Sequence, residues 1–208
     1  MIPPETLVMF FTASLLLALA PGPDNMFVLT QAAVRGWRAG LAITLGLCTG
    51  LFVHTAAVAF GVAAIIQAST LAFTGLKLIG AAYLLCLAWQ AFRAPVESLE
   101  RTTKSAMVLF PLYRRGIVMN ITNPKVSIFF LAFLPQFADP SRGPLAIQMV
   151  ILGIVFMIAA VLVFTLFSVA SDAIGSRLRS SPSVQIYMNK IAGIIFVGLA
   201  VKLVFAKR

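Results

Sequence analysis

Long apolar runs, separated by short polar segments, are the dominant pattern of this sequence. A helix that crosses the roughly 30 Å hydrocarbon core of a bilayer needs about 18 or more mostly apolar residues. Runs of this length occur at residues 7–34, 39–66, 71–92, 116–137, 145–171 and 187–206. The pattern therefore predicts an all-α integral membrane protein with six transmembrane helices.

The polar positions divide these runs into two halves. The longest polar segment, residues 94–111 with ESLERTTKS at its centre, follows the third run. It predicts a first three-helix repeat at 1–93, a cytoplasmic linker at 94–111 and a second three-helix repeat at 112–208. No soluble domain is expected.

Weak internal similarity supports the interpretation of the halves as a repeat. The motif KxxGxxY at 77–83 recurs as KxxGxxF at 190–196, and LAI at 41–43 recurs at 145–147. These matches keep their order along the chain. Because each half has an odd number of spans, the second copy must insert upside down, which gives the inverted repeat of many secondary transporters.

The first helix of each half is predicted to be broken at proline. In the first half, Pro21 and Pro23 flank Gly22, and each proline removes an N–H donor and clashes with a carbonyl four residues earlier. In the second half, Asn123 is a capping residue followed by Pro124 at the position where proline starts a helix well. Paired breaks of this kind indicate the binding site of a transporter.

One charged residue stands beside each break. Asp24 lies 11 residues before Arg35, and Lys125 lies 10 residues after Arg115. At 1.5 Å rise per residue, both are about 15 Å deep, near the middle of the bilayer. A charge there costs about 2.5–3.5 kcal/mol on insertion scales, so Asp24 and Lys125 are expected to face each other or a wet cavity. The structural alternative is a static ion pair that holds the repeats in register.

Composition agrees with a membrane protein. The chain is 61% hydrophobic and 11% charged, with a mean hydropathy of +1.01, so a soluble fold would lack the polar residues to cover its surface. The net charge of +10 comes from Lys and Arg that are spread over the loops. No basic patch interleaved with aromatic residues occurs, which argues against nucleic acid as a partner.

The distribution of Lys and Arg also predicts the orientation. With both termini outside, nine of these residues fall in cytoplasmic loops and three outside. The nine are Arg35, Arg38, Arg93, Arg101, Lys104, Arg114, Arg115, Arg177 and Arg179. Both termini are therefore predicted to be periplasmic.

Two other function classes stay open on the residues alone. A membrane thiol-disulfide electron carrier needs paired redox cysteines, whereas Cys48 and Cys86 stand singly in apolar runs. A divalent-cation exporter needs a cluster of oxygen or histidine ligands, whereas Asp24 is the only carboxylate predicted at the midplane. No metal site and no cofactor are predicted.

Further motifs surround the breaks and cover nearly the whole chain. They are PGPDNMFVLTQ (21–31), RGWRAG (35–40), GLCTG (46–50), VHT (53–55), LKLIGAAYLL (76–85) and NPKVSIFFLAFLPQF (123–137). At these residues the chain resembles the LysE/RhtB family of amino-acid exporters. The resemblance implies a transporter rather than an enzyme, which exports a small neutral amino acid across the bacterial inner membrane, as the threonine and homoserine exporters do.

A zwitterionic amino acid needs a partner at each end. Lys125 and the N–H groups of the restarted helices are expected to hold the carboxylate, and Asp24, with Asn25 and Asn123, the ammonium. The full predicted substrate site is Pro21, Gly22, Pro23, Asp24, Asn25, Asn123, Pro124 and Lys125.

Export also needs a source of energy. The sequence has no G-x-x-x-x-G-K-[ST] loop for ATP, so proton antiport is the simplest expectation. Asp24 and His54 are the predicted proton-coupling residues, although His54 has an equally good interpretation as a hydrogen-bonding residue between helices. The expected partners are the amino acid, protons, membrane lipid and, through a glycine-containing face, a second copy in a homodimer.

Overall fold

The structure is a computed structural model that describes residues 2–63, 70–94, 108–171 and 182–205. All secondary structure in these ranges is helical. The elements are α1 (Pro4–Leu19), α2 (Pro23–Arg35), α3 (Trp37–Ala56), η1 (Ala57–Val62), α5 (Thr70–Arg93), α6 (Leu109–Ile121), α7 (Pro124–Ile128), η2 (Phe129–Phe133), η3 (Leu134–Phe137), η4 (Pro140–Arg142), α8 (Leu145–Val169) and α10 (Pro182–Phe205).

The helices confirm the predicted membrane architecture. Within the described ranges, four helices are long and apolar enough to cross a bilayer, and two bent helix pairs raise the number to six if each pair is one span. The pair α1 and α2 bends by 61°, and the pair α6 with Pro124–Phe137 bends by 48°. Both bends fall at the predicted proline breaks.

Two helices begin five or more residues earlier than predicted. The spans expected from 116 and 187 begin at Leu109 and Pro182. Proline at the start of a helix loses no hydrogen bond, since the first four N–H groups have no partner within the helix, so Pro111 and Pro182 both fit first turns. The predicted linker therefore contributes its last residues to α6, while 95–107 lie outside the described residues.

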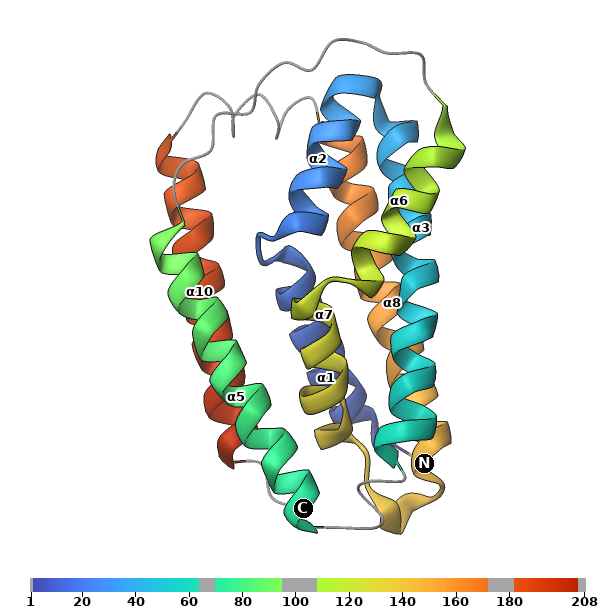
Figure 1. Cartoon of the computed structure of the whole chain (residues 1–208), viewed down its shortest axis with the longest axis vertical. Coiled ribbons are helices and arrows are strands. Elements are labelled where there is room, and N and C mark those ends of the chain that lie inside the picture. Colours follow the sequence, from blue (N-terminus) through green and yellow to red (C-terminus); the bar gives the residue numbers. More distant parts are fainter. Residues whose placement is uncertain (1, 64–69, 95–107, 172–181, 206–208) are drawn as a thin grey trace.

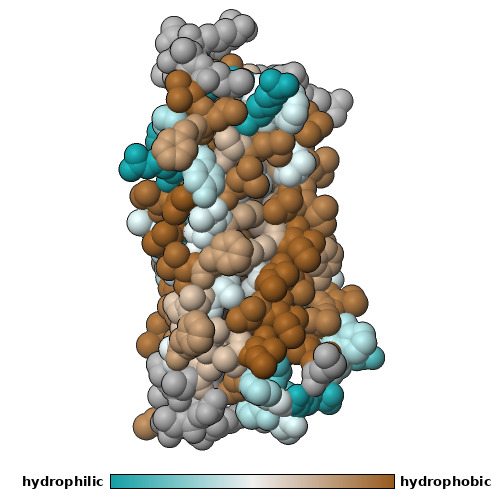
Figure 2. All heavy atoms as spheres, turned by 90° about the vertical axis from the view of Figure 1, so that its right-hand side faces the viewer, coloured by the Kyte–Doolittle hydropathy of each residue, from teal (hydrophilic) through white to brown (hydrophobic). Residues whose placement is uncertain are grey.

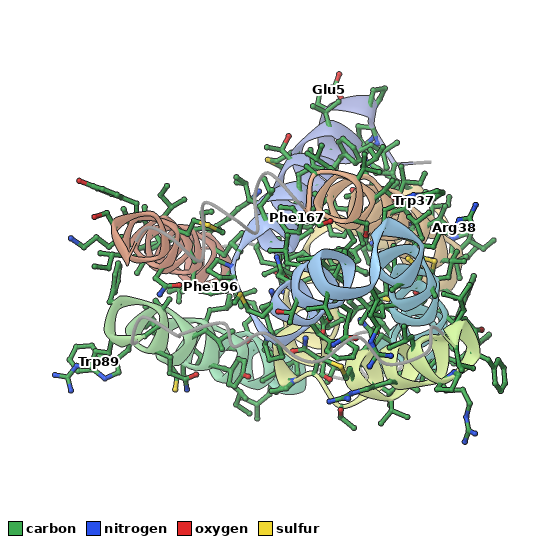
Figure 3. The ribbon with its side chains drawn as sticks, turned by 90° about the horizontal axis from the view of Figure 1, so that it is seen from above. Glu5, Trp37, Arg38, Trp89, Phe167 and Phe196 are labelled. Atoms are coloured by element: carbon green, nitrogen blue, oxygen red, sulfur yellow. The ribbon has the colours of Figure 1, made fainter. Side chains whose placement is uncertain are left out.

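The helices form two groups (Figure 1). α1, α2, α3, α6 and α8 pack together as a bundle, with α3 between α6 and α8. α5 and α10 pack chiefly against each other and stand beside this bundle (Figure 3). Each long element of the second half runs opposite to its counterpart in the first half, as an inverted repeat requires. The division of the chain at 94–111 remains a prediction.

Glycines allow α3 and α6 to approach closely. A Cβ added at Gly46 would overlap the carbonyl oxygen of Tyr113, and one at Gly116 would overlap that of Ile43. One turn further, Gly50 leaves room for the side chain of Asn120. Small residues replace bulky ones where membrane helices meet at short range, and here they bring Asn120 next to α3.

The surface suits a lipid environment. Figure 2 shows a largely apolar band between hydrophilic residues toward both ends of the molecule. Many large apolar side chains are exposed, among them Phe52, Phe60, Ile147 and Leu162. Exposure of this extent is stable only where hydrocarbon replaces water as the solvent.

Candidate functional site

The first break joins the end of α1 to the start of α2. Pro23 occupies the first turn of α2, and the N-cap residue Gly22 has an extended backbone, with φ −176°, and no side-chain cap. The Nδ2 atom of Asn25 donates to the carbonyl oxygen of Ala18 at 2.6 Å. The break is therefore held by an asparagine of α2 that satisfies one of the free carbonyls of α1.

The second break is capped by its own side chain, as predicted. The Oδ1 atom of Asn123 accepts a hydrogen bond from the backbone N–H of Lys125 at 3.0 Å, and Pro124 occupies the first turn of α7. An Asn cap satisfies one of the N–H groups that a helix start leaves without a partner. The restart of this helix is thus fixed locally by its sequence.

Lys125 connects the two breaks. Its Nζ atom donates to the carbonyl oxygens of Leu17 at 3.3 Å and Ala20 at 3.0 Å, and only 7% of the residue is exposed. These carbonyls belong to the end of α1, where the helix dipole carries partial negative charge that favours a cation. Gly22 allows this approach, because a Cβ there would stand 3.1 Å from Nζ.

Asp24 is buried inside the helix bundle. It is 2% exposed, and within the described residues its carboxylate forms no ion pair with Lys125 at 4.0 Å or less. Its Oδ1 atom is buried without a hydrogen-bond partner. Lys125, His54 and the amides of Asn123 and Asn120 lie close enough to act electrostatically on this carboxylate. The two charges are neighbours, but they are not a direct pair.

His54 lies on the same buried side as Asp24. Its Nε2 atom is 3.1 Å from the carbonyl oxygen of Asn120, and its ring centroid is 5.7 Å from that of Phe130. The hydrogen bond spans α3 and α6 and fits the structural interpretation of His54. Its position close enough to act electrostatically on Asp24 fits the interpretation of His54 as a proton-coupling residue.

A cavity of about 580 Å³ connects the breaks to the α5 and α10 pair. Its lining is Pro21, Gly22, Pro23, Met26, Tyr83, Leu87, Gln90, Ala91, Ala94, Asn123, Pro124, Lys125, Met188, Asn189 and Phe196. Among the described residues of this lining, Lys125 is the one that is charged. The volume is typical of small-molecule sites, which run to roughly 300–1,000 Å³.

The predicted site residues divide between this cavity and the bundle interior. Pro21, Gly22, Pro23, Asn123, Pro124 and Lys125 line the cavity. Asp24, Asn25 and His54 do not line it and are buried on the bundle side. The breaks thus separate a cavity lined by the Lys125 ammonium from a bundle interior that contains the Asp24 carboxylate.

The wall opposite the breaks was missed by the sequence reasoning. Tyr83 on α5 and Phe196 on α10 both line the cavity, and Phe196 lies on the side of α10 toward the bundle, whereas Trp89 points outward (Figure 3). These two residues are the last positions of the repeated KxxGxxY and KxxGxxF motifs, which was the available signal. Gln90 and Asn189 add neutral polar groups to the wall.

The structure also bears on the metal and redox classes. In the ranges that it describes, no group of three or more His, Cys, Asp or Glu side chains is placed to hold a metal ion. Cys48 and Cys86 are both free thiols.

Comparisons with known proteins agree on one family. Residues 15–207 match the family described as LysE type translocator. The chain is 33% identical to a "homoserine/homoserine lactone efflux protein" of Salmonella typhimurium over 90% of each chain. It is 33% identical to an "uncharacterized membrane protein" of Vibrio cholerae over 95% of this chain and 96% of that one. It is 26% identical to a "leucine efflux protein" of Salmonella choleraesuis over 93% and 92%. No solved structure matches.

Proposed function

We propose a function from the premise that this chain belongs to the LysE family of translocators, an amino-acid efflux family whose members are transporters and not enzymes. The proposed function is export of small neutral amino acids across the bacterial inner membrane by proton antiport. The observation that carries it is the cavity at the two helix breaks, into whose described lining Lys125 brings an ammonium group.

The carboxylate of the substrate is proposed to bind between Lys125 and the start of α2. The first-turn N–H groups of α2 have no side-chain cap, and a helix N-terminus attracts anions through these groups and its dipole. Pro21, Gly22 and Pro23 expose this terminus to the cavity. The Lys125 ammonium has three donors and gives two of them to the carbonyls of Leu17 and Ala20, so the third is available to the substrate carboxylate. Each of these carbonyl oxygens keeps a second lone pair that suits the substrate ammonium.

The side-chain wall supports a neutral substrate. Tyr83, Leu87, Met188 and Phe196 present apolar and aromatic surface, while Gln90 and Asn189 offer uncharged hydrogen-bonding groups. A charged substrate side chain would lose its water there without gaining an opposite charge. Relatives are named for efflux of homoserine, homoserine lactone and leucine, and the side chains of homoserine and leucine are uncharged.

Asp24 and His54 are proposed to carry the proton. The unpartnered, buried Oδ1 atom of Asp24 is costly as a bare anion, and either a proton or an approaching cation removes that cost. Lys125 acts on Asp24 from the cavity side and His54 from the bundle side. Substrate binding at Lys125 therefore changes the field at the proton site. One charge that moves through 100 mV supplies about 2.3 kcal/mol for export.

The proposed orientation places the α2–α3 turn in the cytoplasm and both termini in the periplasm. Arg35, Arg38 and Arg93 lie at or near the ends of helices on that side (Figure 1). Arg114 and Arg115 lie within the first two turns of α6, and Lys and Arg favour the cytoplasmic side. The cavity reaches Ala94 at the end of α5, so it extends toward the proposed cytoplasmic side. This arrangement suits the loading step of an exporter.

Efflux from proteoliposomes tests this function directly. Vesicles that contain the purified protein are loaded in parallel with labelled homoserine, threonine, leucine, lysine or glutamate, and a pH gradient is imposed. We expect efflux of neutral amino acids, accelerated by protons entering as substrate leaves, and slow release of lysine and glutamate. Protein-free vesicles provide the background. Lack of efflux for every amino acid contradicts the assignment, and efflux indifferent to the pH gradient contradicts the antiport mechanism.

A further inference from the structure

A second cavity, of about 590 Å³, lies at the opposite end of the molecule from the α2–α3 turn. Its lining is Pro3, Thr6, Met9, Phe133, Pro135, Gln136, Phe137, Ala138, Asp139, Pro140, Arg142, Leu145, Gln148, Lys202, Leu203 and Phe205. None of these residues lines the cavity at the breaks. The protein thus has a separate hollow on the side proposed to face the periplasm.

Lys202 brings an available cation to this outer cavity. Its Nζ atom lies 4.6 Å from the ring centroid of Phe137 and 5.9 Å from that of Phe133. In the described part of the chain, no carboxylate lies within 4.0 Å of it. Cation–π contact leaves the N–H donors of an ammonium available on the side away from the rings. The cavity therefore contains an ammonium group that is positioned for an anion.

The other cation in the lining is already engaged. The Nε atom of Arg142 lies 3.1 Å from the Oδ2 atom of Asp139. Hydrogen bonds from Ser141 and Arg142 hold the pKa of Asp139 below its usual range, so the carboxylate stays charged in this pair. Gln148 fixes the same loop through the backbone of Asp139 and Gly143. An incoming anion would meet Lys202 in preference to Arg142.

Gln136 supplies an acceptor in the same cavity. Its Nε2 atom donates to the carbonyl oxygen of Ala132 at 3.2 Å, which fixes the amide. Its Oε1 atom is buried without a hydrogen-bond partner. A buried acceptor of this kind is costly until a donor reaches it. One cavity therefore offers a cation and an unsatisfied acceptor, which match the two ends of a zwitterion.

A tight contact lies between the two cavities. A Cβ added to Gly80 on α5 would overlap the side chain of Ala132 and approach Leu203 on α10. Leu203 lines the outer cavity, and Phe196, two helical turns or about 10 Å earlier on α10, lines the inner one. α10 thus contributes to both cavities, and α5 meets Ala132 and Leu203 at close range at Gly80.

We propose that the outer cavity is a second binding site for a zwitterionic amino acid, the exit site, in which Lys202 binds the carboxylate and Gln136 the ammonium. This inference rests on the proposed export function. The substrate leaves the breaks when α5 moves away from Ala132, and it rests against Lys202 before it is released. An amino acid added from outside should bind the same site and slow efflux.

The test compares Lys202→Gln with Lys190→Gln, a change on the same helix at an exposed lysine that lines neither cavity. Efflux of labelled homoserine is measured in oriented proteoliposomes while unlabelled homoserine is varied first inside and then outside. We expect Lys202→Gln to raise the external concentration for half-inhibition by about tenfold, the loss of a charge-assisted hydrogen bond of about 1.5 kcal/mol. The internal KM should change less than twofold. Lys190→Gln should change neither quantity, and Lys202→Arg should restore inhibition.

Three outcomes overturn the exit site while leaving export intact. One is unchanged external inhibition in Lys202→Gln, and another is an equal change of the internal and external constants, which indicates a general structural role. The third is an effect that disappears in vesicles of phosphatidylcholine alone, since Lys202 would then bind an anionic lipid phosphate. Absence of efflux from the unaltered protein instead contradicts the export function itself.

Discussion

The two helix breaks occupy equivalent places in the two halves but present opposite groups to opposite sides. Asp24 and Lys125 each follow the proline that starts the second helix of a break. Lys125 lines the cavity and donates to the carbonyls of α1. Asp24 is buried in the bundle, and His54 on α3 lies close enough to act on it electrostatically. The same kind of helix break thus presents a cationic side chain in the second half and an anionic side chain in the first.

The N-cap residues show how this division is built. The first break has Gly22, which provides no cap but leaves space for the Lys125 ammonium. The second has Asn123, whose side chain closes its own helix start. One break therefore contributes exposed backbone groups, and the other contributes a rigidly placed cation. In the proposed function, substrate contact and proton contact therefore have separate locations joined by one lysine.

Removal of the cation should have the largest effect. Lys125→Gln keeps a polar side chain, one bond shorter than lysine, but loses the charge, so the substrate carboxylate loses a charge-assisted partner and two α1 carbonyls lose their charged donor. At about 1.5–3 kcal/mol for a hydrogen bond to a charged group, we expect efflux kcat/KM to fall by about a hundredfold. Initial rates of homoserine efflux over a range of internal concentrations measure this.

The matched control is again Lys190→Gln, which removes an exposed lysine outside both cavities. Its efflux should stay within about twofold of the unaltered protein. Thermal unfolding in detergent separates the two explanations for a Lys125 effect. If Lys125→Gln unfolds at a lower temperature but its transport rate per folded molecule equals that of the unaltered protein, the lysine only holds the breaks together.

Removal of the Asp24 charge should abolish proton coupling and leave amino-acid transport in place. Asp24→Asn preserves the shape of the side chain but cannot bind and release a proton. We expect exchange of internal for external amino acid to continue while acceleration by the pH gradient disappears. His54→Gln should reduce this acceleration partially, because His54 acts on Asp24 from a neighbouring helix. Exchange and gradient-driven efflux are measured in the same vesicles.

Full gradient-driven efflux in Asp24→Asn would show that the carboxylate has no part in coupling. Loss of exchange together with loss of coupling would place Asp24 in the substrate site, as the sequence predicted. The comparison of the two breaks would then lose its basis, since both charges would serve the same ligand.

Much of this architecture could be predicted from interactions between residues that are close in the sequence. Apolar length predicts the spans, and Pro21, Pro23 and Pro124 predict both breaks because proline acts on its own helix whatever the fold. The cap at Asn123 is equally local, since the acceptor and the N–H lie two residues apart. These features depend on neighbours in sequence, so one sequence was sufficient for them.

The placement of Asp24 and Lys125 on different sides of the breaks could not be predicted from the sequence. Depth along a helix follows from counting residues, but the side to which a side chain points depends on how the helices pack. Here that packing depends on glycine contacts such as Gly50 against Asn120. The cavity wall was missed for the same reason, because Tyr83 and Phe196 meet the breaks only after α5 and α10 pair.

The N-cap glycine of the first break permits a smaller test. Gly22→Ala is compatible with the extended backbone, but its Cβ would stand 3.1 Å from the Lys125 Nζ atom and displace it slightly. A mild overpacking penalty of about 1 kcal/mol predicts a roughly fivefold rise in the efflux KM. Gly61→Ala is the control, since nothing lies within 4 Å of its added Cβ. Equal KM values for the two variants would mean that the position of the ammonium does not limit binding.

The N-cap asparagine of the second break should affect stability more than affinity. Asn123→Ala removes the acceptor for the Lys125 N–H, a loss of about 1 kcal/mol for a typical cap, while Asn123→Ser retains a capping oxygen. We expect thermal unfolding in detergent to fall for the alanine variant and to recover for serine, with KM for both within about twofold of the unaltered protein. The Gly22 and Asn123 variants thus have opposite signatures at equivalent positions. A large KM change in Asn123→Ala with unchanged unfolding would instead make the Asn123 side chain a direct partner of the substrate, and the second break would then contribute more than a placed cation.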